Sequence, residues 1–322
     1  MEEKREEERI FIMDKNMLQK TGMVWFLAMI CCLLWGSAFP CIKIGYELFQ
    51  IEAADTASQI VFAGVRFFLA GVLALLFGSV LQRKLLLPER KDVPMILKLS
   101  VMQTVVQYLF FYIGLAHTTG VKSSIIEAAN VFVAILIASL IFHQEELTGR
   151  KMVGCAAGFA GVVLINLGSG GMDAQFRWNG EGFILLSTVA YALSSVFIKR
   201  YSAKANPVLL SGWQFCVGGL VMAVVGGLMG GRLTFHEAGC LPLFFYMAVI
   251  SSVAYTLWAI LLKYNPVSKV TVFGFMNPVF GVILSAWLLK ENGQAFSLRG
   301  LTSLILVCIG IYIVNKSDDV AA

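Results

Sequence analysis

The chain has 322 residues, of which 58% are hydrophobic and 14% are charged, and its formal net charge is +5. A soluble domain needs far more polar surface to cover its core, so this composition excludes a soluble globular protein. For a chain placed in a membrane, the small positive charge gives no reason to expect a nucleic-acid partner.

Residues 1–21 precede the first apolar run and mix charges of both signs without an apolar core. A cleavable signal peptide needs a basic start, a short apolar stretch and small residues at the cut, which this segment lacks. We therefore expect a cytoplasmic N-terminal tail at 1–21 and a short cytoplasmic C-terminal tail at 317–322.

Apolar runs of about twenty residues recur along the rest of the chain, and each can cross the ~30 Å hydrocarbon core of a bilayer. They predict an all-α integral membrane protein with ten transmembrane helices. We expect these helices near residues 23–45, 58–81, 95–117, 122–142, 152–168, 180–201, 207–229, 241–262, 268–289 and 300–315.

Lysine and arginine are distributed unevenly between alternate connections. If the N-terminus is cytoplasmic, 18 of these residues lie on the inner side and five on the outer side, while Lys43 and Arg66 lie inside spans. Cytoplasmic loops of membrane proteins carry the excess of Lys and Arg. We therefore expect a multi-pass protein of the plasma membrane with both termini cytoplasmic.

No catalytic, cofactor or metal motif competes with a membrane function. The histidines at 117, 143 and 236 form no HExxH pattern, and the glycine-rich stretch at 166–173 is followed by no GK[ST]. The seven cysteines include no CxxC pair, which leaves them as small apolar residues. We expect no catalytic residue, metal or cofactor, and no ATP drive, so energy has to come from a gradient.

The two halves of the apolar region resemble each other. The segment NVF at 130–132 recurs as NPVF at 277–280, and the same offset of 147 residues carries Tyr108 onto Tyr255. Two further matches at nearby offsets carry residues 64–71 onto 212–219 and residues 35–43 onto 191–199.

Because each half holds five predicted spans, an odd number, the second half enters the bilayer from the opposite side. We expect two inverted five-helix repeats, at 22–170 and 171–316. Inverted repeats of this kind are the architecture of many secondary transporters.

Three stretches also resemble the EamA-like transporters of the drug/metabolite transporter superfamily. They are LLWGSAFPCIK in the first span, RFFLAG in the second and NPVFGVILSAWLLKE in the ninth. The fourth-span run beginning NVFVAILIASLIF is similar but lacks the proline. The resemblance covers residues 23–316 and implies a ten-helix fold that exports or takes up small metabolites through a cavity between its halves.

Polar and aromatic residues at mid-span depth are the candidates for a substrate site, because aromatic faces can stack on a solute while hydroxyl and amide groups orient it. The alternative is that they tie neighbouring helices together. The candidates are Trp35, Ser37, Phe39, Tyr108, Tyr112, Asn130, Tyr191, Ser194, Ser195, Trp213, Gln214, Tyr255, Trp258 and Asn277.

Four further residues are candidates for gating or coupling. Pro40 and Pro278 each remove a helical hydrogen bond, and Pro40 with Gly36 predicts a kinked helix that faces a cavity; Gly36 and Ser37 as a packing notch is the alternative. Arg66 and Glu127 are charges at similar depth that should face the bundle interior. We expect them to form a polar cluster on the outer side that closes the outer gate or takes part in proton coupling. The alternative is a static ion pair that ties helices together, or an arginine that bonds to helix-end carbonyls.

These observations predict a secondary transporter that moves a small-molecule metabolite by alternating access, with a coupled proton as one candidate for the driving ion. The family resemblance favours export, and uptake of an amino acid or nucleoside-like solute is the alternative. An intramembrane enzyme is disfavoured because the spans show no paired catalytic groups at depth. A non-transporting scaffold is disfavoured because it would not need the inverted repeat.

The predicted orientation can be tested by labelling single cysteines placed at Lys84 and Arg177 in a cysteine-depleted background. The cysteine at position 84 should react with an impermeant thiol reagent only from the cytoplasmic side, because it follows the second span. The cysteine at position 177 should react only from the outside, because it follows the fifth. Labelling of both from the same side of intact cells would contradict the ten-span topology.

Overall fold

The structure is a computed structural model that describes residues 15–143, 146–167, 176–202, 204–265 and 270–315. Within these residues the fold is helical and contains no strand. Eight helices are long and apolar enough to cross a membrane, so the chain is a multi-pass integral membrane protein. The predicted C-terminal tail and residues 1–14 of the predicted N-terminal tail lie outside the described residues.

The first half of the chain contains five helical segments after the short helix α2 (Lys15–Leu18). They are α3 (Thr21–Leu48); α4 (Thr56–Leu81); α5 (Val93–Leu99) with the π-helix η1 (Ser100–Gln107) and α6 (Tyr108–Ala116); α7 (Gly120–Glu127) with α8 (Asn130–Leu136) and the π-helix η2 (Ile137–Ile141); and α9 (Gly149–Asn166).

The second half contains five more segments in the same order. They are the π-helix η3 (Trp178–Gly182) with α10 (Phe183–Ser202); α11 (Pro207–Leu228); α12 (Cys240–Tyr264); the 3-10 turn η4 (Val272–Phe275) with α14 (Met276–Leu288); and α16 (Leu298–Asn315), which follows the short helix α15 (Asn292–Ala295).

Each predicted span overlaps one of these segments. Two segments, the ninth and α9, are not both long and apolar enough to count as membrane-crossing helices. The apolar helix at 273–288 is short, and α9 begins with Arg150 and Lys151 close to its start. The structure thus shows eight candidate crossings, and the ten-span fold stays a prediction.

Several helices begin where a side chain caps their first turn. Asn206 accepts hydrogen bonds from the backbone of Val208 and Leu209 at the start of α11, and Thr119 accepts one from the backbone of Lys122 at the start of α7. These caps satisfy backbone N–H groups that would otherwise lack partners at the membrane boundary.

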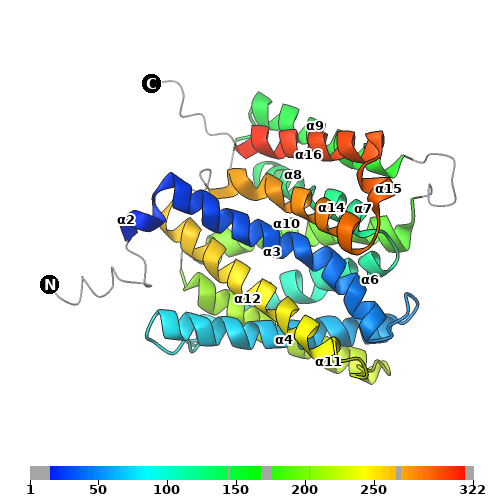
Figure 1. Cartoon of the computed structure of the whole chain (residues 1–322). Coiled ribbons are helices and arrows are strands. Elements are labelled where there is room, and N and C mark those ends of the chain that lie inside the picture. The colour runs from blue at the N-terminus through cyan, green and yellow to red at the C-terminus, as the bar shows by residue number, and fades with distance from the viewer. Residues whose placement is uncertain (1–14, 144–145, 168–175, 203, 266–269, 316–322) are drawn as a thin grey trace.

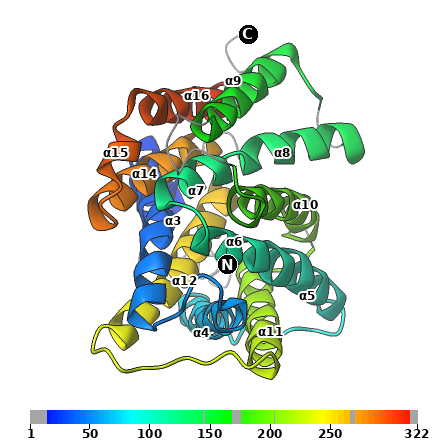
Figure 2. The ribbon, with the colours of Figure 1, turned by 90° about the vertical axis from the view of Figure 1, so that its right-hand side faces the viewer.

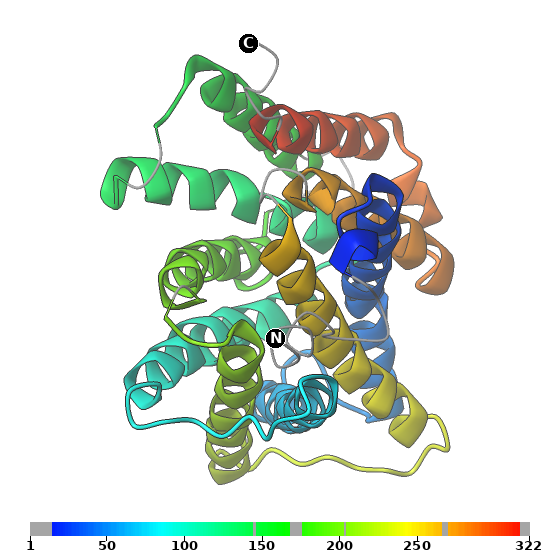
Figure 3. The same cartoon turned by 90° about the vertical axis from the view of Figure 1, so that its left-hand side faces the viewer.

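The helices pack as a central group between two edge pairs. Helices α9 and α16 contact each other at one edge and α4 and α11 at the opposite edge, while α3, α12 and α14 lie between them (Figure 1). The views from the two sides show the same order of layers (Figures 2 and 3). In the centre, α3 contacts α12 and α14, and α10 contacts η1, α6 and α8.

The edge pairs approach closely because glycines face each other across them. A Cβ atom added at Gly219 of α11 would collide with the backbone of Gly64 and Phe68 in α4, and one at Gly310 of α16 would meet the backbone of Gly154 and Gly158 in α9. Small residues let helix backbones come together in a bilayer, where lipid supplies no hydrophobic driving force between helices.

Two ends of the bundle can be distinguished. Helix α3 begins and α16 finishes at one end, which we name the termini-proximal end; the opposite end, where α3 finishes and α15 lies, is the far end (Figure 1).

Replacing Gly219 by Ala should destabilise the protein by about 1–3 kcal/mol, because the added methyl overpacks the α4–α11 contact. The matched control is Gly227→Ala on the same helix, where an added Cβ meets nothing within 4 Å. Thermal unfolding in detergent measures both. Equal melting temperatures for the two variants would contradict a close α4–α11 contact.

Candidate functional site

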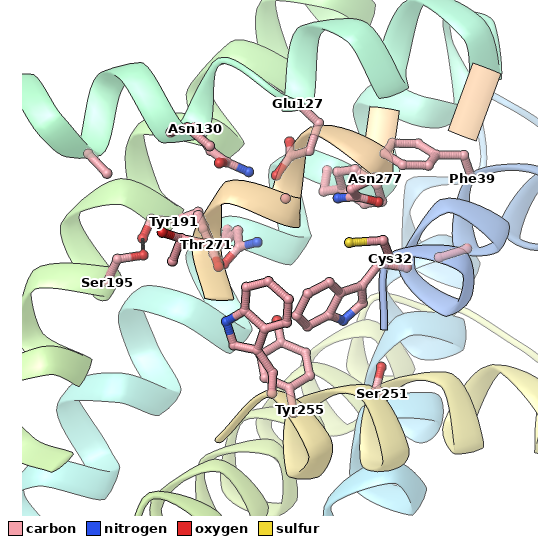
Figure 4. Close-up of a pocket in the computed structure, with 18 of the residues that line it drawn as sticks. Cys32, Phe39, Glu127, Asn130, Tyr191, Ser195, Ser251, Tyr255, Thr271 and Asn277 are labelled. Atoms are coloured by element: carbon pink, nitrogen blue, oxygen red, sulfur yellow. Dashed lines mark hydrogen bonds between the residues drawn. The ribbon is translucent and has the colours of Figure 1, made fainter. Parts of the chain in front are cut away.

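A cavity of about 580 Å³ lies inside the bundle and is lined by residues from both halves of the chain. This volume falls in the range of small-molecule sites. The labelled side chains of Glu127, Asn130 and Asn277 lie on one side of the open space, and Ser251 and Tyr255 lie on the other (Figure 4).

Aromatic rings make up much of the cavity wall. The Trp35 ring packs edge-on against Tyr255 and Trp258, with ring centroids 5.6 and 5.1 Å apart. The Tyr108 ring is stacked on Phe67 at a centroid distance of 3.9 Å. Such rings are fixed by their packing, so they present a preformed apolar surface to a bound molecule.

Tyr108 and Tyr255 meet directly. Their hydroxyl oxygens lie 3.0 Å apart, within hydrogen-bond distance. The two residues stand 147 positions apart, at corresponding points of the sequence repeat. This hydrogen bond thus joins the two halves of the chain at the cavity wall.

Two helices are interrupted where they reach the cavity. The fourth segment breaks between Glu127, the last residue of α7, and Asn130, the first of α8. The ninth changes from the 3-10 turn η4 to α14 just before Asn277, at the equivalent position. Interrupted membrane helices place backbone and side-chain polar groups at a binding site.

Glu127 and its neighbours form a polar group at the first of these breaks. Ser187 of α10 donates a hydrogen bond to a carboxyl oxygen of Glu127 at 3.0 Å, and the Asn130 side chain also bonds to it. Glu127 is buried, at 8% exposure.

Arg66 is a buried cation in the cavity lining. Its guanidinium donates to the backbone oxygen of Met247 at 3.2 Å, to the hydroxyl of Ser251 at 3.0 Å and to the hydroxyl of Tyr112. It also lies over the Phe67 ring, 4.8 Å from the centroid. These partners are all uncharged.

Some buried polar atoms of cavity-lining residues have no hydrogen-bond partner among the described residues. Among them are Nε1 of Trp35, Oε1 of Gln107 and Oδ1 of Asn277. Buried polar groups in proteins are nearly always hydrogen-bonded, so orphaned groups beside a cavity are expected to bond to its contents.

Most of the predicted site residues line this cavity. They are Trp35, Phe39, Tyr108, Asn130, Tyr191, Ser195, Tyr255, Trp258, Asn277, Arg66 and Glu127. Arg66 and Glu127 do not form an ion pair: the pairs among the described residues are Lys91–Glu89 and Lys122–Glu181.

The other predicted residues lie outside the lining and contact neighbouring segments. Ser37 bonds to Tyr246, and the Trp213 ring donates to the backbone oxygen of Leu86. Gln214 donates to Gln103 at 2.6 Å, as expected for an amide that ties two helices together. The remaining four are Tyr112, which bonds to Arg66, Ser194, which bonds to the backbone of Tyr191 in its own helix, Pro278 and Pro40.

Pro40 is also absent from the lining, and α3 continues through it from Thr21 to Leu48. A Cβ atom added at Gly36 would lie 2.7 Å from Phe280. Gly36 therefore fits the alternative interpretation of this stretch, in which it is a notch that lets α14 pack closely against α3.

The cavity lining also contains residues that the sequence did not single out. Gln107 and Ser251 are ordinary polar residues that belong to no motif; at the offset of 147 residues, Gln107 corresponds to Ala254 and Ser251 to Thr104. The others include Cys32, Phe111, Arg150, Lys151, Thr271 and Asn315.

The cavity reaches the termini-proximal end of the bundle. Arg150 and Lys151 at the start of α9 and Asn315 at the end of α16 belong to its lining, and Thr271 donates to Asn315 at 2.9 Å.

Polar contacts hold the far end together. Both carboxyl oxygens of Glu291 accept hydrogen bonds from the backbone of Gly120 and Val121 at the start of α7, at 3.0 and 2.8 Å. Glu181 pairs with Lys122 at 3.1 Å, and the Lys43 ammonium donates to the backbone oxygen of Thr118 at 2.6 Å. The Glu291 and Glu181 contacts join the two halves, and the Lys43 contact lies within the first half.

Comparison with known proteins identifies related chains. The profile of the EamA-like transporter family matches two segments, residues 22–167 and 178–316. An uncharacterized transporter of Archaeoglobus fulgidus is 28% identical over 91% of this chain and 98% of its own length. The uncharacterized inner membrane transporter YedA of Escherichia coli is 27% identical over 90% of this chain and 92% of its own length.

A solved crystal structure shares the fold. It superposes with a TM-score of 0.64 at 15% sequence identity and covers 91% of this chain and 96% of its own. At this identity the likeness concerns the fold alone.

Neighbouring serines on α10 test the position of the cavity. A cysteine at Ser195, which lines it, should react with a small impermeant thiol reagent, and a cysteine at the buried Ser194 should not. The measurement is labelling in membranes of a cysteine-depleted background, with access from the termini-proximal side. Equal labelling at the two positions would contradict the assigned cavity wall.

Proposed function

The chain belongs to the EamA-like transporter family, and we propose that it is a secondary transporter moving a small organic metabolite across the plasma membrane by alternating access. The observation that carries this proposal is the cavity itself. Both halves of the chain line it, and both contribute an interrupted helix at a repeat-related position.

The helix contacts support an inverted repeat of two five-helix units, 22–170 and 171–316. Helix α3 contacts α12 and α14, and its counterpart α10 contacts η1–α6 and α8, the counterparts of those partners. Helices α4, α7 and α9 contact their own counterparts α11, α14 and α16. Exchanging the two halves therefore converts these contacts into one another, as expected for inverted repeats that take opposite roles in alternating access.

The distribution of contacts supports an inward-open state. On the proposed orientation, with 18 basic residues inside and five outside, the termini-proximal end is cytoplasmic. The cavity then reaches the cytoplasm, while the Glu291 and Lys122–Glu181 contacts close the external end. The Escherichia coli relative is named an inner membrane transporter, which agrees with a plasma-membrane location for this chain.

Export is the favoured direction because of the family resemblance, and uptake of an amino acid or nucleoside-like solute is the alternative. Counterflow in proteoliposomes tests transport itself. Vesicles preloaded with one unlabelled metabolite should accumulate the same labelled metabolite above equilibrium, for at least one member of a metabolite panel. A scaffold or an enzyme would show no such accumulation with any metabolite that binds.

Glu127 is the proposed proton-coupling residue, because it is the carboxyl group in the cavity lining and contacts hydrogen-bonding side chains rather than Arg66. Proton relays in transporters use such intramembrane carboxyl groups. Arg66 then acts separately from Glu127 and not as its ion-pair partner.

Replacing Glu127 by Gln should abolish the dependence of transport on a pH gradient and leave substrate exchange intact, because the amide keeps the shape but carries no titratable proton. The control is Glu47→Gln, which removes an exposed carboxyl outside the cavity. Uptake into proteoliposomes with and without a pH gradient measures the effect. A folded Glu127→Gln protein that keeps full pH-gradient dependence would remove Glu127 from the mechanism.

A further inference from the structure

We propose that Arg66 is the substrate anchor and that the substrate is an organic monoanion, a carboxylate with a planar or apolar body. This inference rests on the proposed transport function and adds the chemical class of the substrate and the residue that selects it.

The first argument is the missing counter-charge of Arg66. An arginine side chain has five N–H donors, and three of them are used here, by Met247, Tyr112 and Ser251. Neither ion pair among the described residues includes Arg66. Its partners are one backbone carbonyl and two hydroxyls, so no carboxylate among the described residues neutralises the guanidinium, and an anion that enters the cavity would supply that charge.

The sequence repeat strengthens this argument. Gln214 stands at the position that corresponds to Arg66, and its amide bonds to Gln103 in the same way that Arg66 bonds to Ser251. A neutral amide therefore suffices to tie these helices together. The charge at position 66 is not needed for packing, and a role toward a ligand accounts for it.

The charged groups of the lining favour an anion overall. Three of them are cations, Arg66 in the interior and Arg150 and Lys151 at the cytoplasmic end, and Glu127 is a carboxyl group.

The remaining lining selects the body of the substrate and the type of anion. The rings of Trp35, Tyr255 and Trp258 offer faces and edges for a planar or apolar group. The orphaned oxygens of Gln107 and Asn277 can accept from N–H or O–H groups of that body. A guanidinium binds a carboxylate with two parallel hydrogen bonds, whereas a dianionic phosphate would bring a second charge to a depth where the lining supplies one cation.

The test uses the purified wild-type protein and ligands that differ only in charge. Sets of three share one body, such as 3-phenylpropionate, 3-phenylpropionamide and 3-phenylpropylamine, with indole and cyclohexyl counterparts. Thermal unfolding is followed with a thiol-reactive dye, since the cysteines are buried or partly buried in the fold. Ligands that bind the folded state raise its unfolding temperature.

We expect stabilisation by one or more acids and none by the matched amides and amines. Stabilisation by amides or amines equal to that by the acids, or no stabilisation by any acid, overturns the proposal. Counterflow of a neutral or cationic metabolite without any effect of acids would overturn the anion site and leave transport standing. Binding of acids without exchange would support the anion site and contradict the proposed transport function.

Two variants assign the selectivity to Arg66. Arg66→Gln, which installs the residue found at position 214, should weaken binding of the best acid by about 10- to 100-fold, since charged hydrogen bonds contribute about that much, and the matched amide should still give no stabilisation. Arg66→Lys should keep the preference for acids with weaker binding, and Lys151→Gln is the control at the entrance. An Arg66→Gln protein that folds and still prefers acids overturns the assignment.

Discussion

A polar group within the hydrocarbon of a bilayer has no water to bond to, so it needs a partner in the protein or in a cavity. This constraint organises the whole molecule. It accounts for the amide pair of Gln214 and Gln103, for the three neutral partners of Arg66 and for the burial of the Lys122–Glu181 ion pair. Among the buried polar atoms that have no partner within the described residues, those of Trp35, Gln107 and Asn277 border the cavity, while others, such as the hydroxyls of Ser123 and Ser303, lie elsewhere in the fold.

The same constraint explains why the edge pairs and the far end are held by different kinds of contact. The edge pairs α4–α11 and α9–α16 pack through glycines, which bring backbones together without polar contacts. The far end is held instead by hydrogen bonds and an ion pair between the halves, which can break when water enters. We therefore regard the glycine-packed pairs as the permanent contacts between the two units, and the polar contacts of the far end as the gate.

Much of this arrangement could be predicted from the sequence, because apolar length and repetition are local features. The runs of apolar residues predicted where the helices lie, and the 147-residue offset related Tyr108 to Tyr255 and Asn130 to Asn277, which all line the cavity.

Which face of each helix points to the cavity could not be predicted from apolar length and repetition. Arg66 and Gln214 stand at equivalent positions, yet one lines the cavity and the other does not. Trp213 and Tyr112 were predicted from depth alone and contact neighbouring segments. The break after Glu127 was also hidden, since no proline marks it as Pro278 marks the ninth segment.

The central claim is that the far end must open and close for each transport cycle, and a reversible cross-link across it is the most direct test. An added Cβ at Gly120 lies 3.0 Å from the Cβ of Ser285, close to the separation found in disulfides, about 3.5–4.5 Å. Cysteines at these two positions, in a cysteine-depleted background, should stop counterflow when oxidised and restore it when reduced. Full counterflow with the disulfide formed would contradict alternating access through this end of the protein.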